Sequence, residues 1–241
     1  MDDLLSLGLK HAKKALLSGC SAGALASMIH CDDFRKQLPD NAVVKCISDA
    51  GFFVDVRDVM NKATIQSFYR DVVSLHGMAP QLSASCTRGD KCIFPQYLVR
   101  GIKTPLFVLN AAYDTWQIQN ILVPTTEQSH SWQFCINDPA ECSKDQLGLL
   151  QGFRVNMLEA LDAVEASEEG GLFINSCFIH CQSEFDMTWH RQRTPVINQR
   201  SVAEAVGDWF FKRRPAKYID CPYPCNPSCF KIGVWSSPTS N

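Results

Sequence analysis

The stretch "LLSGCSAGALASMIH", residues 16–30, places one serine between small residues, after an apolar run and before a segment with helical spacing. Gly19, Ser21 and Gly23 fit the pattern G-x-S-x-G, in which a serine stands on a sharp turn between a strand and a helix. Small neighbours are needed there because the turn brings the two backbones close together. The stretch therefore predicts a nucleophilic Ser21; the competing interpretation is a turn residue or a helix N-cap.

The rest of the chain alternates short apolar runs with longer periodic segments, which is typical of an α/β fold with a largely parallel sheet. We expect strands at 14–18, 42–48, 104–110 and 171–176, and helices at 22–37, 57–75, 95–101, 116–122, 144–167 and 200–213. An amphipathic helix is expected before the first strand, and Ser143 is a candidate N-cap for the helix that follows it. With no internal repeat or linker, residues 1–241 are expected to form a single domain.

Length and charge exclude several classes of protein. A chain of 241 residues with 46% hydrophobic content can bury a large core. The net charge of -2 and the pI near 6.3 argue against a nucleic-acid partner. No apolar run approaches 18 residues, so we expect no membrane-spanning helix and no membrane partner.

Twelve cysteines, an even number, favour a disulfide framework made in an oxidising compartment. Zinc is the alternative, with Cys86 and Cys92, or Cys221, Cys225 and Cys229, as ligands, but the paired C-x2-C spacing of zinc ribbons is missing. We therefore expect no metal and no cofactor. The first residues carry no apolar signal segment, so we expect that the chain lacks the front of a longer protein.

Cysteine spacing predicts some of the pairs. Short separations favour two local bridges, and two cysteines near residue 180 are expected to pair with the C-terminal cluster, whereas the cysteine in the serine turn is expected to be a buried free thiol. These candidates are Cys86 with Cys92, Cys135 with Cys142, Cys177 and Cys181 with two of Cys221, Cys225 and Cys229, and the unpaired Cys20.

A serine nucleophile needs a histidine base. His180 lies just beyond the carboxyl end of the predicted strand 171–176, which is the edge where α/β active sites form. The other five histidines fall in expected helices, a helix end or polar loops: His11, His30, His76, His130 and His190. His180 is therefore the predicted base.

The base needs an acid to orient it. Asp114 follows the predicted strand 104–110, and the order Ser21, Asp114, His180 is the chain order of α/β-hydrolases. Asp49 and Asp55 compete because they follow the strand 42–48, but the acid of this fold usually comes from a later strand. Asp114 is the predicted acid, with Asp49 in reserve as a structural carboxylate near the turn.

Several stretches together resemble one family: "ALLSGCSAG", "SDAGFF", "TPLFVLNAAYDTWQI", "LQGFR", "FINSCFIHCQ" and "IDCPYPCNPSC". They resemble the plant pectin acetylesterases, relatives of the Notum carboxylesterases, over nearly all of the chain. The resemblance implies an α/β-hydrolase-like fold without its N-terminal strands, the triad Ser21, Asp114 and His180, no metal, and hydrolysis of acetyl esters on pectin by a secreted cell-wall enzyme. Two small departures are Ala24, where a glycine is expected, and Ile179, where an alanine is usual.

The resemblance also implies an oxyanion hole. The N–H of Ala22 can supply one donor, and in the family the others come from an early glycine-rich loop that these residues do not contain. Losing one donor costs about 3–4 kcal/mol, so this form is expected to be weakly active or inactive. Two alternatives stay open: a Notum-like deacylase of lipid or small esters, and a non-catalytic remnant of the fold.

Overall fold

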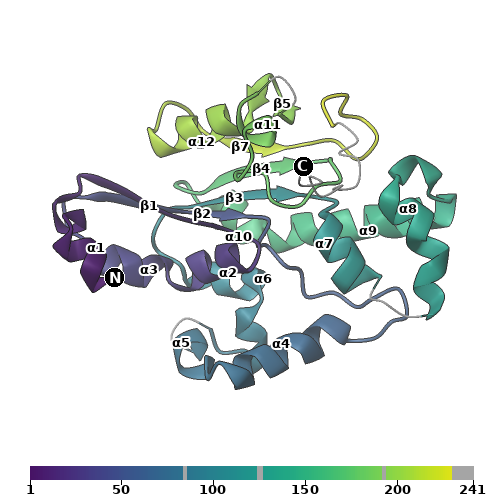
Figure 1. Cartoon of the computed structure of the whole chain (residues 1–241), viewed down its shortest axis with the longest axis horizontal. Coiled ribbons are helices and arrows are strands. Elements are labelled where there is room, and N and C mark those ends of the chain that lie inside the picture. Colours follow the sequence, from purple (N-terminus) through teal and green to yellow (C-terminus); the bar gives the residue numbers. More distant parts are fainter. Residues whose placement is uncertain (84–85, 124–126, 192–193, 230–241) are drawn as a thin grey trace, which may run out of the picture.

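The computed structural model describes residues 1–83, 86–123, 127–191 and 194–229. Its centre is one parallel sheet of five strands in the order β1-β2-β3-β4-β7 (Figure 1). The strands are β1 (Lys14–Cys20), β2 (Val43–Asp49), β3 (Leu106–Ala111), β4 (Gly171–Asn175) and β7 (Lys217–Ile219). The α/β prediction is confirmed. Because every neighbouring pair is parallel, all carboxyl ends lie at one edge of the sheet.

The four expected strands are present, with ends shifted by a few residues. β7 was not expected, because three half-buried or exposed residues carry no readable alternation. A short antiparallel pair, β5 (Val196–Ile197) and β6 (Arg200–Ser201), lies outside the main sheet and was not expected either.

The helices follow the expected segments with several breaks. The longer ones are α2 (Ala22–Ile29), α4 (Thr64–Leu75), α9 (Lys144–Ala160) and α12 (Val202–Phe210). The shorter ones are α1 (Asp2–Ser6), α3 (Cys31–Lys36), α5 (Ala79–Ser83), α6 (Pro95–Leu98), α7 (Thr115–Gln117), α8 (Gln133–Asn137), α10 (Asp162–Ala166) and α11 (Asp186–Trp189). Further single turns are 3-10 or π-helical.

Several helix predictions differ from the structure in their bounds, and 200–213 is helical only over Val202–Phe210. The segment 22–37 divides at His30, and 144–167 divides at Leu161. The segment 57–75 is helical only from Thr64, because the Asp58 carboxylate accepts hydrogen bonds from the N–H groups of Met60 and Lys62 and holds a turn there. The expected leading helix is only α1, followed by one 3-10 turn.

The Ser143 cap is confirmed. Its hydroxyl accepts the Gln146 N–H at 3.2 Å, and the Gln146 side chain accepts the Ser143 N–H at 2.8 Å. This reciprocal pair is a capping box, which stabilises a helix start.

Helices cover both faces of the sheet (Figure 1). On one face, α2, α4, α6 and α9 contribute to the larger apolar cluster. On the other, Trp209 of α12 packs over Phe107 and Phe173. Within the described ranges no helix combines the length and apolarity that a bilayer crossing requires. The sheet thus lies between two layers of helices, and the loops that follow its strands lie at its carboxyl edge.

All twelve cysteines form six disulfides. The local bridges Cys86–Cys92 and Cys135–Cys142 are confirmed, as is a bond from Cys177 to the C-terminal cluster, at Cys229. Two bridges, Cys31–Cys46 and Cys221–Cys225, were not expected.

The prediction for Cys20 and Cys181 was wrong. Cys20 is not a free thiol and Cys181 does not pair with the C-terminal cluster; they bond to each other across 161 residues of sequence. Spacing along the chain cannot reveal a pair that the sheet brings together. Since all these sulfurs are oxidised, the zinc alternatives have no thiolate ligands to offer.

Candidate active site

Ser21 lies on the turn between β1 and α2. Its backbone is left-handed, with φ 57° and ψ -123°, and its N–H donates to the Asp49 carbonyl at 2.9 Å. A non-glycine residue adopts this conformation only where its surroundings enforce it, and such residues gather at functional sites. Ser21 occupies the N-cap position of α2, but its hydroxyl makes no capping hydrogen bond. The hydroxyl is therefore not used to start the helix.

The tight approach of β1 to α2 depends on Gly19. A Cβ there would collide with the Gly23 carbonyl group and lie 2.9 Å from the Ala24 nitrogen. A Cβ on Gly51, after β2, would collide with the Cβ of Ala24. The missing side chain at residue 51 therefore leaves room for alanine at position 24. A Cβ on Gly23, by contrast, would meet no described atom within 4 Å. The need for small residues thus falls on Gly19 and Gly51, not on both glycines of the motif.

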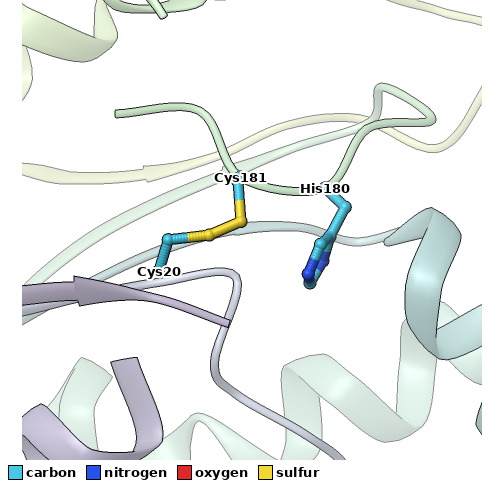
Figure 2. Close-up of side chains that lie close together, drawn as sticks. All are labelled: Cys20, His180 and Cys181. Carbon is cyan, nitrogen blue, oxygen red and sulfur yellow. A yellow bond between two sulfur atoms is a disulfide. The ribbon is translucent and has the colours of Figure 1, made fainter. Parts of the chain in front are cut away.

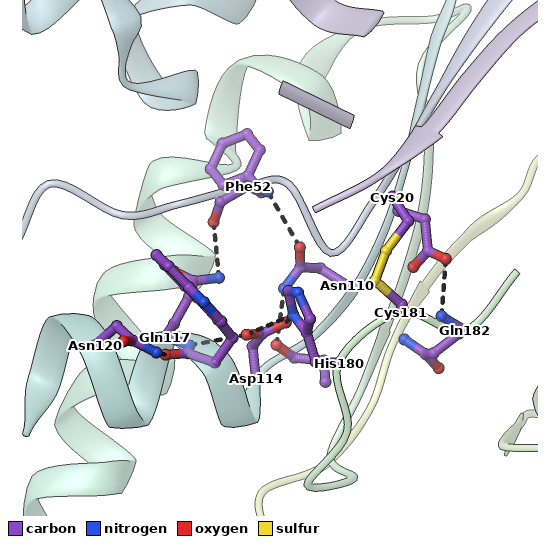
Figure 3. Close-up of polar contacts among 12 residues, drawn as sticks. Cys20, Phe52, Asn110, Asp114, Gln117, Asn120, His180, Cys181 and Gln182 are labelled. Carbon is purple, nitrogen blue, oxygen red and sulfur yellow. Dashed lines mark hydrogen bonds and ion pairs between the residues drawn. A yellow bond between two sulfur atoms is a disulfide. The ribbon is translucent and has the colours of Figure 1, made fainter. Parts of the chain in front are cut away.

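Asp114 and His180 meet at the carboxyl edge of the sheet (Figure 3). Asp114 follows β3, is fully buried, and accepts the Gln117 N–H at 2.9 Å. His180, in the loop after β4, places Nδ1 at 2.8 Å and 3.0 Å from the two carboxylate oxygens. A ring nitrogen facing a carboxylate carries the proton, so Nδ1–H donates and Nε2 is left to accept. The Trp116 ring stacks on the imidazole at 6.3 Å between centroids.

The surroundings shift the pKa values of both groups. Burial by itself would lower the pKa of His180, but the Asp114 hydrogen bond and the charges of Asp114, Asp49 and Glu184 outweigh it and raise the pKa above its ordinary 6.5. Burial raises the pKa of Asp114, against hydrogen bonds from His180 and the N–H groups of Gln117 and Trp116. The pair is thus arranged to stabilise an imidazolium.

The competing carboxylates have other partners. Asp49 is fully buried, and its Oδ2 accepts the Gln182 N–H at 2.8 Å and the Ser183 N–H and hydroxyl at 2.6 Å. Asp55 accepts from the Tyr97 hydroxyl at 2.9 Å and belongs to a separate polar cluster. Of the three aspartates weighed from sequence, only Asp114 contacts His180.

Ser21 and His180 are brought near each other by their neighbours in sequence. Cys20 and Cys181 form a disulfide with 5.7 Å between Cα atoms, so the Cα atoms of Ser21 and His180 are at most about 13 Å apart. An imidazole nitrogen lies within 4.8 Å of both sulfurs (Figure 2). The described atoms form no Ser21–His180 hydrogen bond, a contact that in many enzymes tightens only around substrate. The five other histidines are all exposed.

Two polar residues that support this edge were not predicted from the sequence. Asn110 and Gln117 are fully buried. Asn110 Oδ1 accepts the Phe52 N–H at 3.2 Å, and the Gln117 amide donates to the Phe52 carbonyl (Figure 3). Gln117 also accepts the Val54 N–H at 3.1 Å. A polar residue inside an apolar strand, as in "FVLN", was the available signal, because buried amides need partners.

Comparisons with known proteins agree with this architecture. A family model described as pectinacetylesterase matches residues 1–230. Pectin acetylesterase 5 of Arabidopsis thaliana is 49% identical over 236 residues, which are 96% of this chain and 55% of that protein. Pectin acetylesterase 7 of the same plant is 47% identical over 97% of this chain and 61% of its own length. The chain therefore spans little more than half of these relatives.

More distant relatives carry another name. The palmitoleoyl-protein carboxylesterase notum1a of Danio rerio is 26% identical over 94% of this chain and 47% of its own length. Among solved structures, the Wnt deacylase Notum from Drosophila superposes with a TM-score of 0.71 at 22% identity, over 95% of this chain and 62% of that one. At this identity the likeness shows a shared fold.

Proposed function

Because the chain belongs to the pectinacetylesterase family, we propose that it is a serine esterase that removes acetyl groups from pectin. The observation that carries the proposal is the contact between the buried Asp114 and the half-buried His180, joined through the Cys20–Cys181 bond to the strained Ser21 turn. Acyl transfer requires a base, an acid that orients it and a serine hydroxyl, and His180, Asp114 and Ser21 are the residues that we assign to these roles.

The reaction proceeds by two acyl transfers. Ser21 Oγ attacks the acetyl carbonyl while His180 Nε2 takes its proton; the bond to the sugar oxygen then breaks, and the proton passes to that oxygen, which leaves as a hydroxyl and leaves an acetyl-serine behind. A water then attacks the acetyl-serine while the same nitrogen takes its proton; the bond to Ser21 Oγ breaks, the proton returns to that oxygen, and acetate is released. Asp114 keeps Nδ1 protonated and stabilises the imidazolium in both steps.

The negative oxygen formed in each step needs N–H donors. Ala22 is the first residue of α2, where N–H groups lie free of intrahelical partners, and we assign its N–H as one donor. Effective oxyanion holes use at least two donors, and each contributes about 3–4 kcal/mol. The polypeptide 1–241 expressed by itself is therefore expected to turn over slowly.

The cellular setting follows from the disulfides. Six bridges are typical of an oxidising compartment, which supports export to the cell wall, where acetylated pectin is the substrate.

Acetate release from acetylated pectin by residues 1–241, with Ser21→Ala as control, tests the proposal. Slow release that the substitution abolishes is expected. Release unchanged by Ser21→Ala would refute the assignment, and no release under any condition would favour the non-catalytic alternative. Because the fold is shared with Notum, p-nitrophenyl acetate and a long-chain p-nitrophenyl ester should be compared; preference for the long chain would favour a lipid deacylase.

A further inference from the structure

The loop that carries His180 crosses the ends of several strands. β1 and β4 are separated by β2 and β3, so no ladder hydrogen bond connects them, and strand spacing places them about 14 Å apart. Residues 176–185 nevertheless run back along this edge without helix or strand. His180 contacts Asp114 after β3, Gln182 contacts Asp49 at the end of β2, and Cys181 bonds to Cys20 at the end of β1.

Two independent attachments hold the far end of this loop. The first is the Cys20–Cys181 disulfide, which joins the residue before Ser21 to the residue after His180. The second is Asp49, whose carbonyl accepts the Ser21 N–H while its Oδ2 accepts three hydrogen bonds from Gln182 and Ser183. One buried residue thus grips both the serine turn and the histidine loop.

The backbone is left-handed on both sides of the Cys20–Cys181 disulfide, a conformation that neighbouring contacts must enforce at residues other than glycine. Ser21 and Cys181 both have φ 57°. Left-handed backbone at non-glycine residues costs on the order of 1–3 kcal/mol and persists only where neighbouring contacts over-determine it. In Figure 2 the imidazole of His180 lies beside the disulfide that provides such a contact.

We propose that Cys20 and Cys181, joined as a disulfide, act with the Asp49 carboxylate as positioning residues that hold the His180 imidazole at the Ser21 hydroxyl. This inference rests on the proposed function. Without the clamp, the loop stays attached at its start through Cys177–Cys229 but can withdraw from β1. A displacement of about 1 Å at a reacting centre can cost a hundredfold in rate. Loss of the clamp should therefore lower kcat much more than it weakens substrate binding.

Asp49 has a second, electrostatic effect. The charges that act on His180 come from Asp114, Asp49 and Glu184, and all three raise its pKa. Asp49→Asn keeps an oxygen for the loop N–H groups but removes the charge. The acid limb of kcat/KM should then move to lower pH while most of kcat is retained, whereas Asp49→Ala should lose kcat.

The decisive variant is Cys20→Ala with Cys181→Ala, compared with Cys135→Ala with Cys142→Ala, which removes a local bridge between α8 and the loop before α9. Both leave every remaining cysteine paired. We expect only the first to lower kcat on p-nitrophenyl acetate, by about a hundredfold with KM little changed, and to slow labelling of Ser21 by diisopropyl fluorophosphate. The pKa of His180, followed by NMR, should fall toward its ordinary value in that variant alone.

The outcomes separate the two hypotheses. Equal kcat, labelling rate and imidazole pKa in the two double variants would overturn the clamp while leaving the esterase standing. If the unaltered chain neither hydrolyses the ester nor takes up the fluorophosphate, the proposed function fails. The imidazole titration then still decides the clamp, because an unchanged pKa after loss of Cys20–Cys181 contradicts it.

Discussion

Gly19→Ala and Gly23→Ala form a matched pair that tests the geometry of the serine turn. Both add one methyl group within the same motif. At residue 19 the new Cβ would collide with the Gly23 carbonyl and lie 2.9 Å from the Ala24 nitrogen, so α2 must move away from β1. At residue 23 it meets no described atom within 4 Å and lies in a helix, where alanine is favoured over glycine.

The magnitudes follow from these surroundings. Overpacking of a close backbone contact costs about 1–3 kcal/mol of unfolding free energy, and the Gly23 change contributes roughly 0.5 kcal/mol in the opposite direction. For a chain of this size the two melting temperatures should differ by roughly 3–14 °C, with Gly19→Ala the lower. Calorimetric scans at one rate measure this. Equal melting temperatures, or a reversed order, would refute the close approach described for β1 and α2.

Three further predictions concern the site itself. Asp114→Asn should lower kcat about 10³–10⁴-fold with little change in KM, because the imidazolium loses its buried counter-charge; stopped ester assays measure it, and a loss below tenfold would contradict the assignment. Activity of the unaltered chain should fall as pH drops through the raised pKa of His180, so the acid limb of kcat/KM should lie above pH 6.5; a limb near pH 4 would point to a carboxylate base. Gln117→Leu leaves the buried Val54 N–H without its acceptor and the Phe52 carbonyl without its donor, and should lower the free energy of unfolding in urea by about 2–4 kcal/mol; an unchanged midpoint and slope would show that the amide does not support this edge.

The sequence alone determined where the principal strands lie along the chain. It also showed that polar groups follow the carboxyl ends of these strands. Apolar runs mark β1 to β4, and in a parallel sheet their carboxyl ends must share one edge. A serine, two aspartates and a histidine that follow those runs were therefore expected to lie near one another. Chain position favoured Asp114 over Asp49, because the acid of this fold usually comes from a later strand, but only the structure shows that Asp114 is the one that touches His180.

Only the tertiary structure decided the contacts between residues that follow non-adjacent strands of the sheet. Cys20 and Cys181 lie 161 residues apart in sequence, and no local pattern marks them as partners. Their pairing requires the loop after β4 to run back past two strands, and that path is set by buried hydrogen bonds to Asp49 and Asp114. Local spacing reports short-range geometry, as at Ser143, whereas contacts made across a sheet arise only when all its strands are in place.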